Sequence, residues 1–157
     1  MQTLSDLTKW VGVLNRQLQN GTLLQSIIAD NERFIVDCVA NKQLYEQGQN
    51  ALGVYIDSYM PYSPITVEIK KQKGQPYDRV TLRDTGDFQK SIKVDANRTE
   101  FEIVATDRKT PALLGKYGEE IFGLTPENKG VLIWDKIYPQ LLEQCKGLIF
   151  GGENDLI

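Results

Sequence analysis

The triplet Asp84-Thr85-Gly86 has the residue types of an aspartic protease centre, in which two such aspartates share a proton and activate water. A single copy of the triplet would require a homodimer. Arg83 directly precedes the triplet and would hold a neighbouring carboxylate ionised, which opposes proton sharing. The triplet therefore fits a turn or a helix cap better than a catalytic site. A dimeric aspartic protease is the least favoured of the functions that the sequence allows.

The sequence contains no histidine. This excludes Ser-His and Cys-His nucleophile pairs and removes the commonest transition-metal ligand. Cys38 and Cys145 are isolated and have no metal-ligand spacing. Glu119 and Glu120, together with Asp107, could form an acidic cluster, but adjacent acids on a helix point in different directions. We therefore predict that the protein is not an enzyme and has no catalytic residues, no metal and no cofactor.

The composition is that of a folded domain, with 41% hydrophobic and 25% charged residues. The net charge of -3 does not indicate nucleic-acid binding. There is no apolar run of about 18 residues, so we predict no membrane span, and the first ten residues do not resemble a signal peptide. We expect one domain over residues 1–150 and a flexible tail over 151–157.

The first 48 residues have the spacing of amphipathic helices. Apolar side chains recur at three- and four-residue steps on two stretches. Asn20-Gly21 fits the end of the first helix, and Asp30-Asn31 could divide the second stretch into two helices. Trp10 and Trp134 lie on apolar helical faces, where we expect them to be packed in the core, with anchoring in an interface as the alternative. The apolar positions are Leu4, Leu7, Trp10, Val11, Leu14, Leu18, Leu24, Ile27, Ile28, Phe34, Ile35, Cys38, Val39 and Tyr45.

Residues 62–84 change to a period of two. Apolar residues alternate with polar ones after Pro64, and a second short run contains Val80 and Leu82. This pattern predicts an extended β-hairpin arm with a basic tip at Lys73-Gly74. Its candidate arm or subunit-interface residues are Ile65, Val67, Ile69, Lys70, Lys71, Lys73 and Arg79.

The stretch from residue 70 to 93 carries seven basic and three acidic side chains, a net charge of +4. The lysines could simply keep the edges of a hairpin unpaired. Alternatively, they could dock the arm on an acidic neighbouring subunit or on DNA, and protein docking is the better fit because no aromatic side chains are arranged beside them.

Residues 85–150 are predicted to contain a small antiparallel sheet and a C-terminal helix. Ser91 to Asp95 and Glu100 to Thr106 read as two strands, with Asn97-Arg98 as the turn. Thr125-Pro126-Glu127 is a typical helix start. The order of helices, strands and helix favours an α+β fold, with the sheet packed against the C-terminal helix.

The middle of the chain resembles the tail-completion, neck and minor-tail proteins of tailed bacteriophages. The shared pattern is Leu-x-x-Thr-Gly-x-hydrophobic-x-x-Ser-Ile, followed by a β-hairpin and a Tyr/Phe-Gly element before a last helix. Residues 62–124 carry most of the resemblance. The motif residues are Leu82, Asp84, Thr85, Gly86, Phe88, Ser91, Ile92, Tyr117 and Gly118.

The resemblance implies a structural virion protein that forms a ring of six or twelve copies at the head–tail junction or in the upper tail. Such a protein would contact neighbouring portal, neck or tail proteins, would touch packaged DNA only incidentally, and would reside in the host cytoplasm before assembly. In this sequence the motif itself fits a folding role, because Gly86 permits a positive φ and Phe88 and Ile92 can line a core. The alternative is a small phage-encoded module that binds or regulates a host protein.

Overall fold

A computed structural model describes residues 4–150 of the chain and has an α+β fold, as the sequence predicted. Helices dominate, and the sheet is a single antiparallel pair of strands. No helix in the described part is both long and apolar enough to cross a membrane. The elements in chain order are α1 (Leu4–Gln19), α2 (Thr22–Asp30), α3 (Glu32–Asp37), the π-helix η1 (Cys38–Gln47), the 3₁₀ turn η2 (Ile56–Ser58), α4 (Pro64–Gln72), α5 (Asp87–Lys90), β1 (Ile92–Ala96), β2 (Phe101–Ala105), α6 (Thr110–Tyr117), the 3₁₀ turn η3 (Glu119–Ile121), α7 (Pro126–Val131), the π-helix η4 (Leu132–Ile137) and α8 (Tyr138–Phe150).

The described residues form two compact units. Unit 1 comprises residues 4–31, 96–101 and 130–150, and unit 2 comprises residues 32–95 and 102–129. The expected single domain over residues 1–150 stays a prediction.

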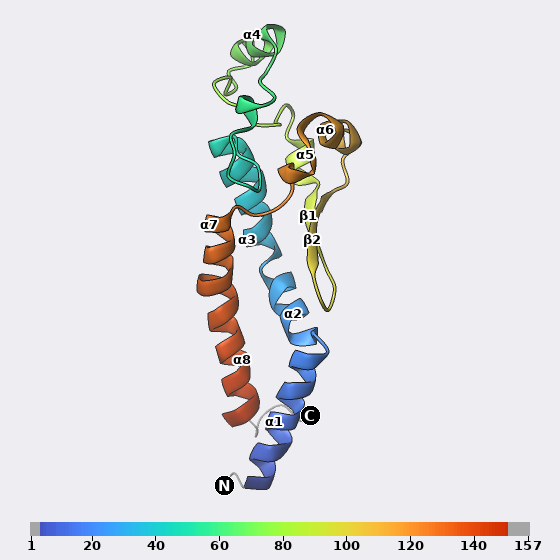
Figure 1. Cartoon of the computed structure of the whole chain (residues 1–157), viewed down its shortest axis with the longest axis vertical. Coiled ribbons are helices and arrows are strands. Elements are labelled where there is room, and N and C mark those ends of the chain that lie inside the picture. The colour runs from blue at the N-terminus through green and yellow to red at the C-terminus, as the bar shows by residue number, and fades with distance from the viewer. Residues whose placement is uncertain (1–3, 151–157) are drawn as a thin grey trace. The chain divides into compact units, whose positions relative to one another are not determined.

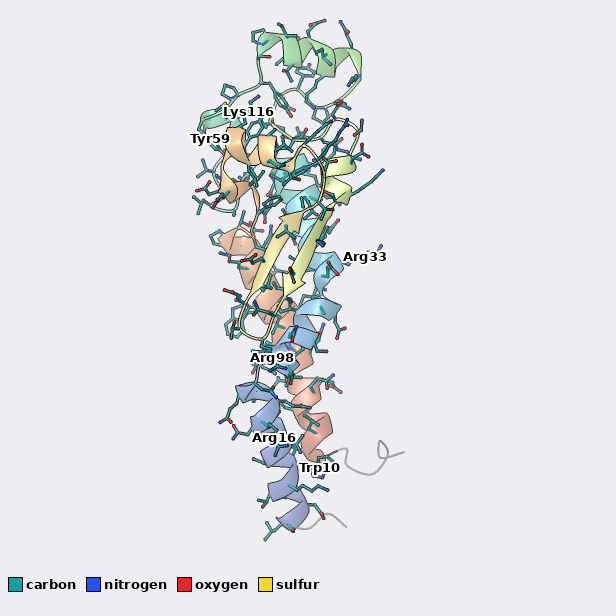
Figure 2. The ribbon with its side chains drawn as sticks, turned by 90° about the vertical axis from the view of Figure 1, so that its right-hand side faces the viewer. Trp10, Arg16, Arg33, Tyr59, Arg98 and Lys116 are labelled. Atoms are coloured by element: carbon teal, nitrogen blue, oxygen red, sulfur yellow. The ribbon has the colours of Figure 1, made fainter. Side chains whose placement is uncertain are left out.

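In unit 1, α8 lies beside α1 and α2 and runs in the opposite direction (Figure 1). Gly21 separates α1 from α2 with a φ of 74°, and the side chain of Asn20 accepts the backbone N–H of Thr22. A Cβ atom at Gly21 would collide with the backbone carbonyl of Arg98, which lies in the hairpin turn (Figure 2). The predicted end of the first helix is therefore confirmed, and glycine is needed there for both backbone conformation and close approach.

The predicted break at Asp30-Asn31 is also confirmed. Asn31 ends α2 and is buried, and its side-chain amide donates to the carbonyl of Ile27 (2.8 Å) and to Oε1 of Gln140 (3.1 Å). Asn31 thus joins the end of α2 to α8 within unit 1.

One expectation for unit 1 was wrong. Trp134 is 65% exposed, although its helical spacing predicted core packing, and Trp10 is only half-buried (Figure 2). Trp134 lies in η4, where the wider π-helical turn shifts the faces of the helix. Leu132 is the buried residue of that segment, and Trp134 is left facing outward, with its ring 5.7 Å from that of Tyr138.

The predicted hairpin arm over residues 62–84 is wrong, because Ile65, Val67, Ile69, Lys70 and Lys71 all lie in helix α4. Ser63 caps this helix by accepting the backbone N–H of Thr66 (3.2 Å), and Pro64 occupies its first turn. Both are strong helix-start signals, and they outweigh an alternation of only three apolar residues.

The segment that follows α4 forms no strand. Val80, Thr81 and Leu82 are consecutively buried, so this stretch is part of the core of unit 2. Its backbone groups bond to side chains: Thr81 N–H donates to the hydroxyl of Tyr62 (2.9 Å), and Gln89 Nε2 donates to the carbonyl of Thr81 (3.2 Å). Such side-chain partners replace the ladder that a hairpin would have supplied.

The strand pair and its turn are confirmed, and Oδ1 of Asn97 accepts the backbone N–H groups of Thr99 and Glu100. Side chains of α2 and α3 bond to the hairpin, through Gln25 to the carbonyl of Ala96 and through Glu32 to the N–H of Val94. The packing of the sheet against the C-terminal helix stays a prediction.

Unit 2 is held together by a buried amide. Gln43 is fully buried, and its Nε2 donates to the carbonyl of Gly123 (2.9 Å). Its Oε1 accepts from the backbone of Thr125 (3.0 Å) and from Nδ2 of Asn128 (2.7 Å). Because every polar atom of this amide is used, η1 and the start of α7 are fixed to each other. The core around it comprises Ile35, Val39, Leu44, Ile56, Val80, Ile121 and Leu124.

We expect Gln43→Ala to lower the free energy of unfolding by about 2–4 kcal/mol, because it leaves buried donors and an acceptor without partners. Chemical denaturation followed by circular dichroism measures this. Gln72→Ala, at an exposed position, is the matched control and should change stability little. Equal losses for the two variants would contradict the role assigned to Gln43.

Candidate functional site

A pocket of about 400 Å³ opens in unit 2 between α4, the loop that precedes α5, and α6. We call it the α4–α6 pocket. It combines apolar walls with several charged groups, as ligand-binding pockets in proteins commonly do. Its lining residues are Tyr62, Thr66, Ile69, Lys70, Lys73, Gln75, Leu82, Arg83, Asp84, Thr85, Gly86, Asp87, Phe88, Gln89, Lys109, Leu113 and Tyr117.

The structure brings most of the motif residues together around this pocket. Leu82, Asp84, Thr85, Gly86, Phe88 and Tyr117 line it. Ser91 and Ile92 lie behind it: Ile92 is buried, and the hydroxyl of Ser91 donates to the carbonyl of Phe88 (2.8 Å) and accepts the N–H of Asp107 (3.0 Å).

Gly86 and Gly118 have backbone conformations that favour glycine. Gly86 precedes α5 with a φ of 91°, and Gly118 ends α6 with a φ of 88°. The predicted positive φ at Gly86 is confirmed. No side chain caps α5, so the predicted cap by Asp84 or Thr85 is wrong; Thr85 instead donates its hydroxyl to the carboxylate of Asp87.

Tyr117 is buried at the end of α6, and its carbonyl accepts the hydroxyl of Tyr59 (3.0 Å), which lies beside α6 in Figure 2. This bond fixes the C-terminal end of α6 to the segment that precedes α4. The wall that α6 gives to the pocket is therefore held in place from outside the pocket.

Lys70 is the structural centre of the pocket. It was expected on an exposed arm, but it is buried. Its ammonium donates to the carbonyl of Arg83 (2.7 Å) and to Oε1 of Gln75 (3.2 Å), and it lies 5.0 Å from the centre of the Tyr62 ring. Gln75 in turn donates to the carbonyl of Asp84 (2.8 Å). Lys70 thus braces the loop that carries the motif against α4.

Leu82 adopts a strained backbone conformation within this loop. Its φ is 54°, a region that side chains other than glycine adopt at an energetic cost, and its side chain is buried against the pocket. Strained residues of this kind persist where the surrounding structure holds them, and they concentrate at binding and catalytic sites.

Asp84 forms an ion pair with Lys73 (2.6 Å), and this ion pair lowers its pKa. The hydrogen bond from Lys73 is the largest cause, burial acts in the opposite direction, and the charges of Lys73, Lys109 and Lys70 add to the lowering. Arg83, expected to be the neighbouring cation, lies over the ring of Tyr45 instead (4.6 Å). A carboxylate held ionised in this way is poorly suited to share a proton with a second aspartate.

The remaining residues expected on the basic arm are separated by the structure. Lys71 lies over the ring of Tyr77 (5.2 Å), while Arg79 donates to the carbonyl of Tyr45 (3.0 Å) and pairs with Asp78 (2.8 Å). Among residues 4–150, no three cysteine, aspartate or glutamate side chains gather into a group that could hold a metal ion.

Gln89 lines the pocket and was not among the predicted site residues. It is 7% exposed, and its Nε2 donates to the carbonyl of Thr81, but its Oε1 has no hydrogen-bond partner. A buried acceptor without a partner is uncommon in folded proteins, and a water molecule, an ion or a ligand can supply the missing donor. Its position one residue after Phe88, inside the motif, was the only available signal.

A scan of known protein families, a search of curated proteins and a search of solved structures gave no match to this chain.

We expect Lys70→Met to lower the free energy of unfolding by about 1–3 kcal/mol, because it removes two hydrogen bonds and leaves the Arg83 carbonyl without its charged partner. Lys71→Met, one residue along the same helix and exposed, is the matched control. Thermal unfolding of both variants measures the difference. Equal stability of the two would show that Lys70 does not brace the loop.

We expect the Asp84–Lys73 ion pair to stabilise the fold above about pH 4 and to lose this effect as the pH falls below it, because a lowered pKa favours folding only while the carboxylate is ionised. Asp84→Asn should therefore cost about 0.5 kcal/mol at pH 7 and progressively less toward about pH 2.5, as the pH falls through the lowered pKa of Asp84, the small size reflecting an exposed pair. Urea titrations between these pH values measure this, with Asp95→Asn as the control. A difference that grows toward low pH would contradict the assignment.

Proposed function

We propose that this chain is a structural protein of a tailed-bacteriophage virion that assembles with copies of itself into a ring at the head–tail junction or in the upper tail. The proposal includes contacts with neighbouring portal, neck or tail proteins. Two kinds of support carry it: the order of motifs along the sequence, and the distribution of exposed apolar side chains over unit 1.

The exposed apolar stripe of α1 is the main structural support. None of the residues of α1 is buried, although the helix is amphipathic. Leu4, Val11 and Leu18 recur every seven residues and are 84%, 51% and 39% exposed. Residues seven apart lie on one face of a helix, so these side chains place exposed apolar area along one face of α1. Covering such a surface in an assembly is favourable, by about 25 cal/mol for each Å² of apolar area removed from water.

A second exposed apolar surface lies on the C-terminal helical part of unit 1. Trp134, Tyr138 and Leu142 are all exposed, and the first two rings are in edge-to-face contact. Tryptophan and tyrosine are enriched among the residues that contribute most to protein–protein binding. A ring requires that one surface of the subunit bind a different surface of the next, and unit 1 offers two such surfaces on separate helices.

The candidate contact residues of α4 remain available for assembly. Ile65 is 73% exposed and Ile69 is also exposed, so both present apolar groups on a helix, where the sequence had predicted a strand. Lys70 is not available, because it is buried.

A small phage-encoded module that binds a host protein is the second candidate. The α4–α6 pocket, with its unpartnered buried acceptor, favours it. The two candidates differ in location: a virion protein sediments with particles, while a regulatory module stays in the lysate. A dimeric aspartic protease would require Asp84, so normal particle maturation with Asp84→Asn would remove that alternative.

Purified particles test the main proposal directly. Mass spectrometry should find the chain in particles at several copies each, and electron microscopy should place it in the neck or upper tail. A chain that stays in the lysate after the particles have been sedimented would overturn the proposal.

We expect Val11→Glu to convert the ring to smaller species, because it places a charge within the surface that subunits would bury. The side chain is half exposed in the subunit, so circular dichroism should show an intact fold. Leu52→Glu, at an exposed apolar position of unit 2, is the matched control. Native mass spectrometry measures the copy number, and an unchanged ring for both Val11→Glu and Trp134→Ser would exclude these two surfaces as ring contacts.

A further inference from the structure

The unpartnered oxygen of Gln89 defines what the α4–α6 pocket can bind. Gln89 Nε2 is already engaged with the carbonyl of Thr81, so the free Oε1 can only accept a hydrogen bond. A ligand group that reaches this oxygen would therefore have to donate an N–H or O–H. The backbone N–H of an extended peptide is such a donor.

Lys109 supplies the pocket with a cation that acts on Asp84 through its charge, without an ion pair. Lys70 is bonded to the carbonyl of Arg83, Lys73 to Asp84, and Arg83 lies over Tyr45. The ammonium of Lys109 makes no ion pair or hydrogen bond with any residue that the structure describes.

The charge of the pocket favours an acidic ligand. Its lining carries four cations, namely Lys70, Lys73, Arg83 and Lys109, against the two carboxylates of Asp84 and Asp87, which leaves a net charge of +2. The free cation and the net charge both favour a ligand with carboxylates.

The remaining walls of the pocket are apolar. Ile69 of α4, Leu82 and Phe88 of the motif, and Leu113 and Tyr117 of α6 contribute them. A ligand that satisfies all parts of the pocket has a backbone N–H, one or two aliphatic side chains and adjacent carboxylates. Its chemical class is an acidic peptide segment with apolar residues beside its acids.

We propose that this ligand is the segment 151–157 of a second copy of the chain. The segment contains Glu153 and Asp155, followed by Leu156 and Ile157, and it has no basic residue. Its two carboxylates match the net charge of the pocket, and its aliphatic pair matches the apolar walls. The proposal rests on the assembly of copies stated above, and it identifies the α4–α6 pocket as the point where one copy holds the next.

Photo-crosslinking in the full chain tests this contact. A benzoylphenylalanine residue replaces Leu156, and isotopically labelled and unlabelled copies are mixed before irradiation. Crosslinked peptides that join position 156 of one copy to α5 or α6 of another are the expected result. Crosslinks confined to a single copy, or crosslinks to residues outside the pocket, would overturn the proposal.

Charge reversal gives an independent test of the same contact. Lys109→Glu should reduce the yield of crosslinks between copies about tenfold, because it replaces attraction at the pocket by repulsion. Asp155→Lys should reduce it similarly, and the two changes together should restore it. Lys93→Glu, at an exposed position of β1, is the matched control. A yield that is the same for Lys109→Glu and Lys93→Glu would overturn the role of the pocket.

Failure of this inference can be told from failure of the proposed function. A ring that is present in particles and unaffected by removal of residues 151–157 overturns the tail contact alone. A chain that is absent from particles but still shows the crosslink between copies supports the contact and overturns the virion assignment.

Discussion

The hydrogen bond from the ammonium of Lys70 to the carbonyl of Arg83 is the interaction on which the candidate site depends. The segment from Val80 to Arg83 has no strand partner, so its position is set by side chains of other segments. Among these, Lys70 is charged and buried, and hydrogen bonds to charged groups are the stronger ones. This hydrogen bond fixes the segment from Val80 to Arg83 relative to α4. The segment has no regular secondary structure, yet it can therefore form a wall of the pocket.

The motif that prompted the assembly hypothesis has a clear structural role. Phe88 and Ile92 are buried, Gly86 supplies a positive φ, and the hydroxyl of Ser91 links α5 to Asp107, two residues after β2. Such residues are constrained by folding, yet several of them also line the pocket. The same residues can therefore position a binding surface and stabilise the core beneath it.

The sequence predicted the elements whose signals are local and long. The stripe of α1, the break at Asn31, the strand pair and the start of α7 all depend on spacing or on capping residues, and all are present. Helix α4 was not predicted because its three alternating apolar residues resemble a strand, although Ser63 and Pro64, a cap followed by proline, are the more specific signal. The burial of Lys70, the exposure of Trp134 and the free oxygen of Gln89 depend on contacts distant in sequence or on a π-helical turn, which no local pattern encodes.

The polar groups of the α4–α6 pocket that have no hydrogen-bond or ion-pair partner among the described residues indicate which ligands the pocket can bind. Three of its four cations already stabilise the subunit, through a carbonyl, a carboxylate and an aromatic ring. The groups that remain are the ammonium of Lys109 and the amide oxygen of Gln89. An amide oxygen has no nucleophilic or acid–base role at neutral pH, and a lysine at the rim of a pocket attracts anions. In the contact that we propose, the ammonium of Lys109 would attract the carboxylates of the peptide, and the oxygen of Gln89 would accept a hydrogen bond from its backbone.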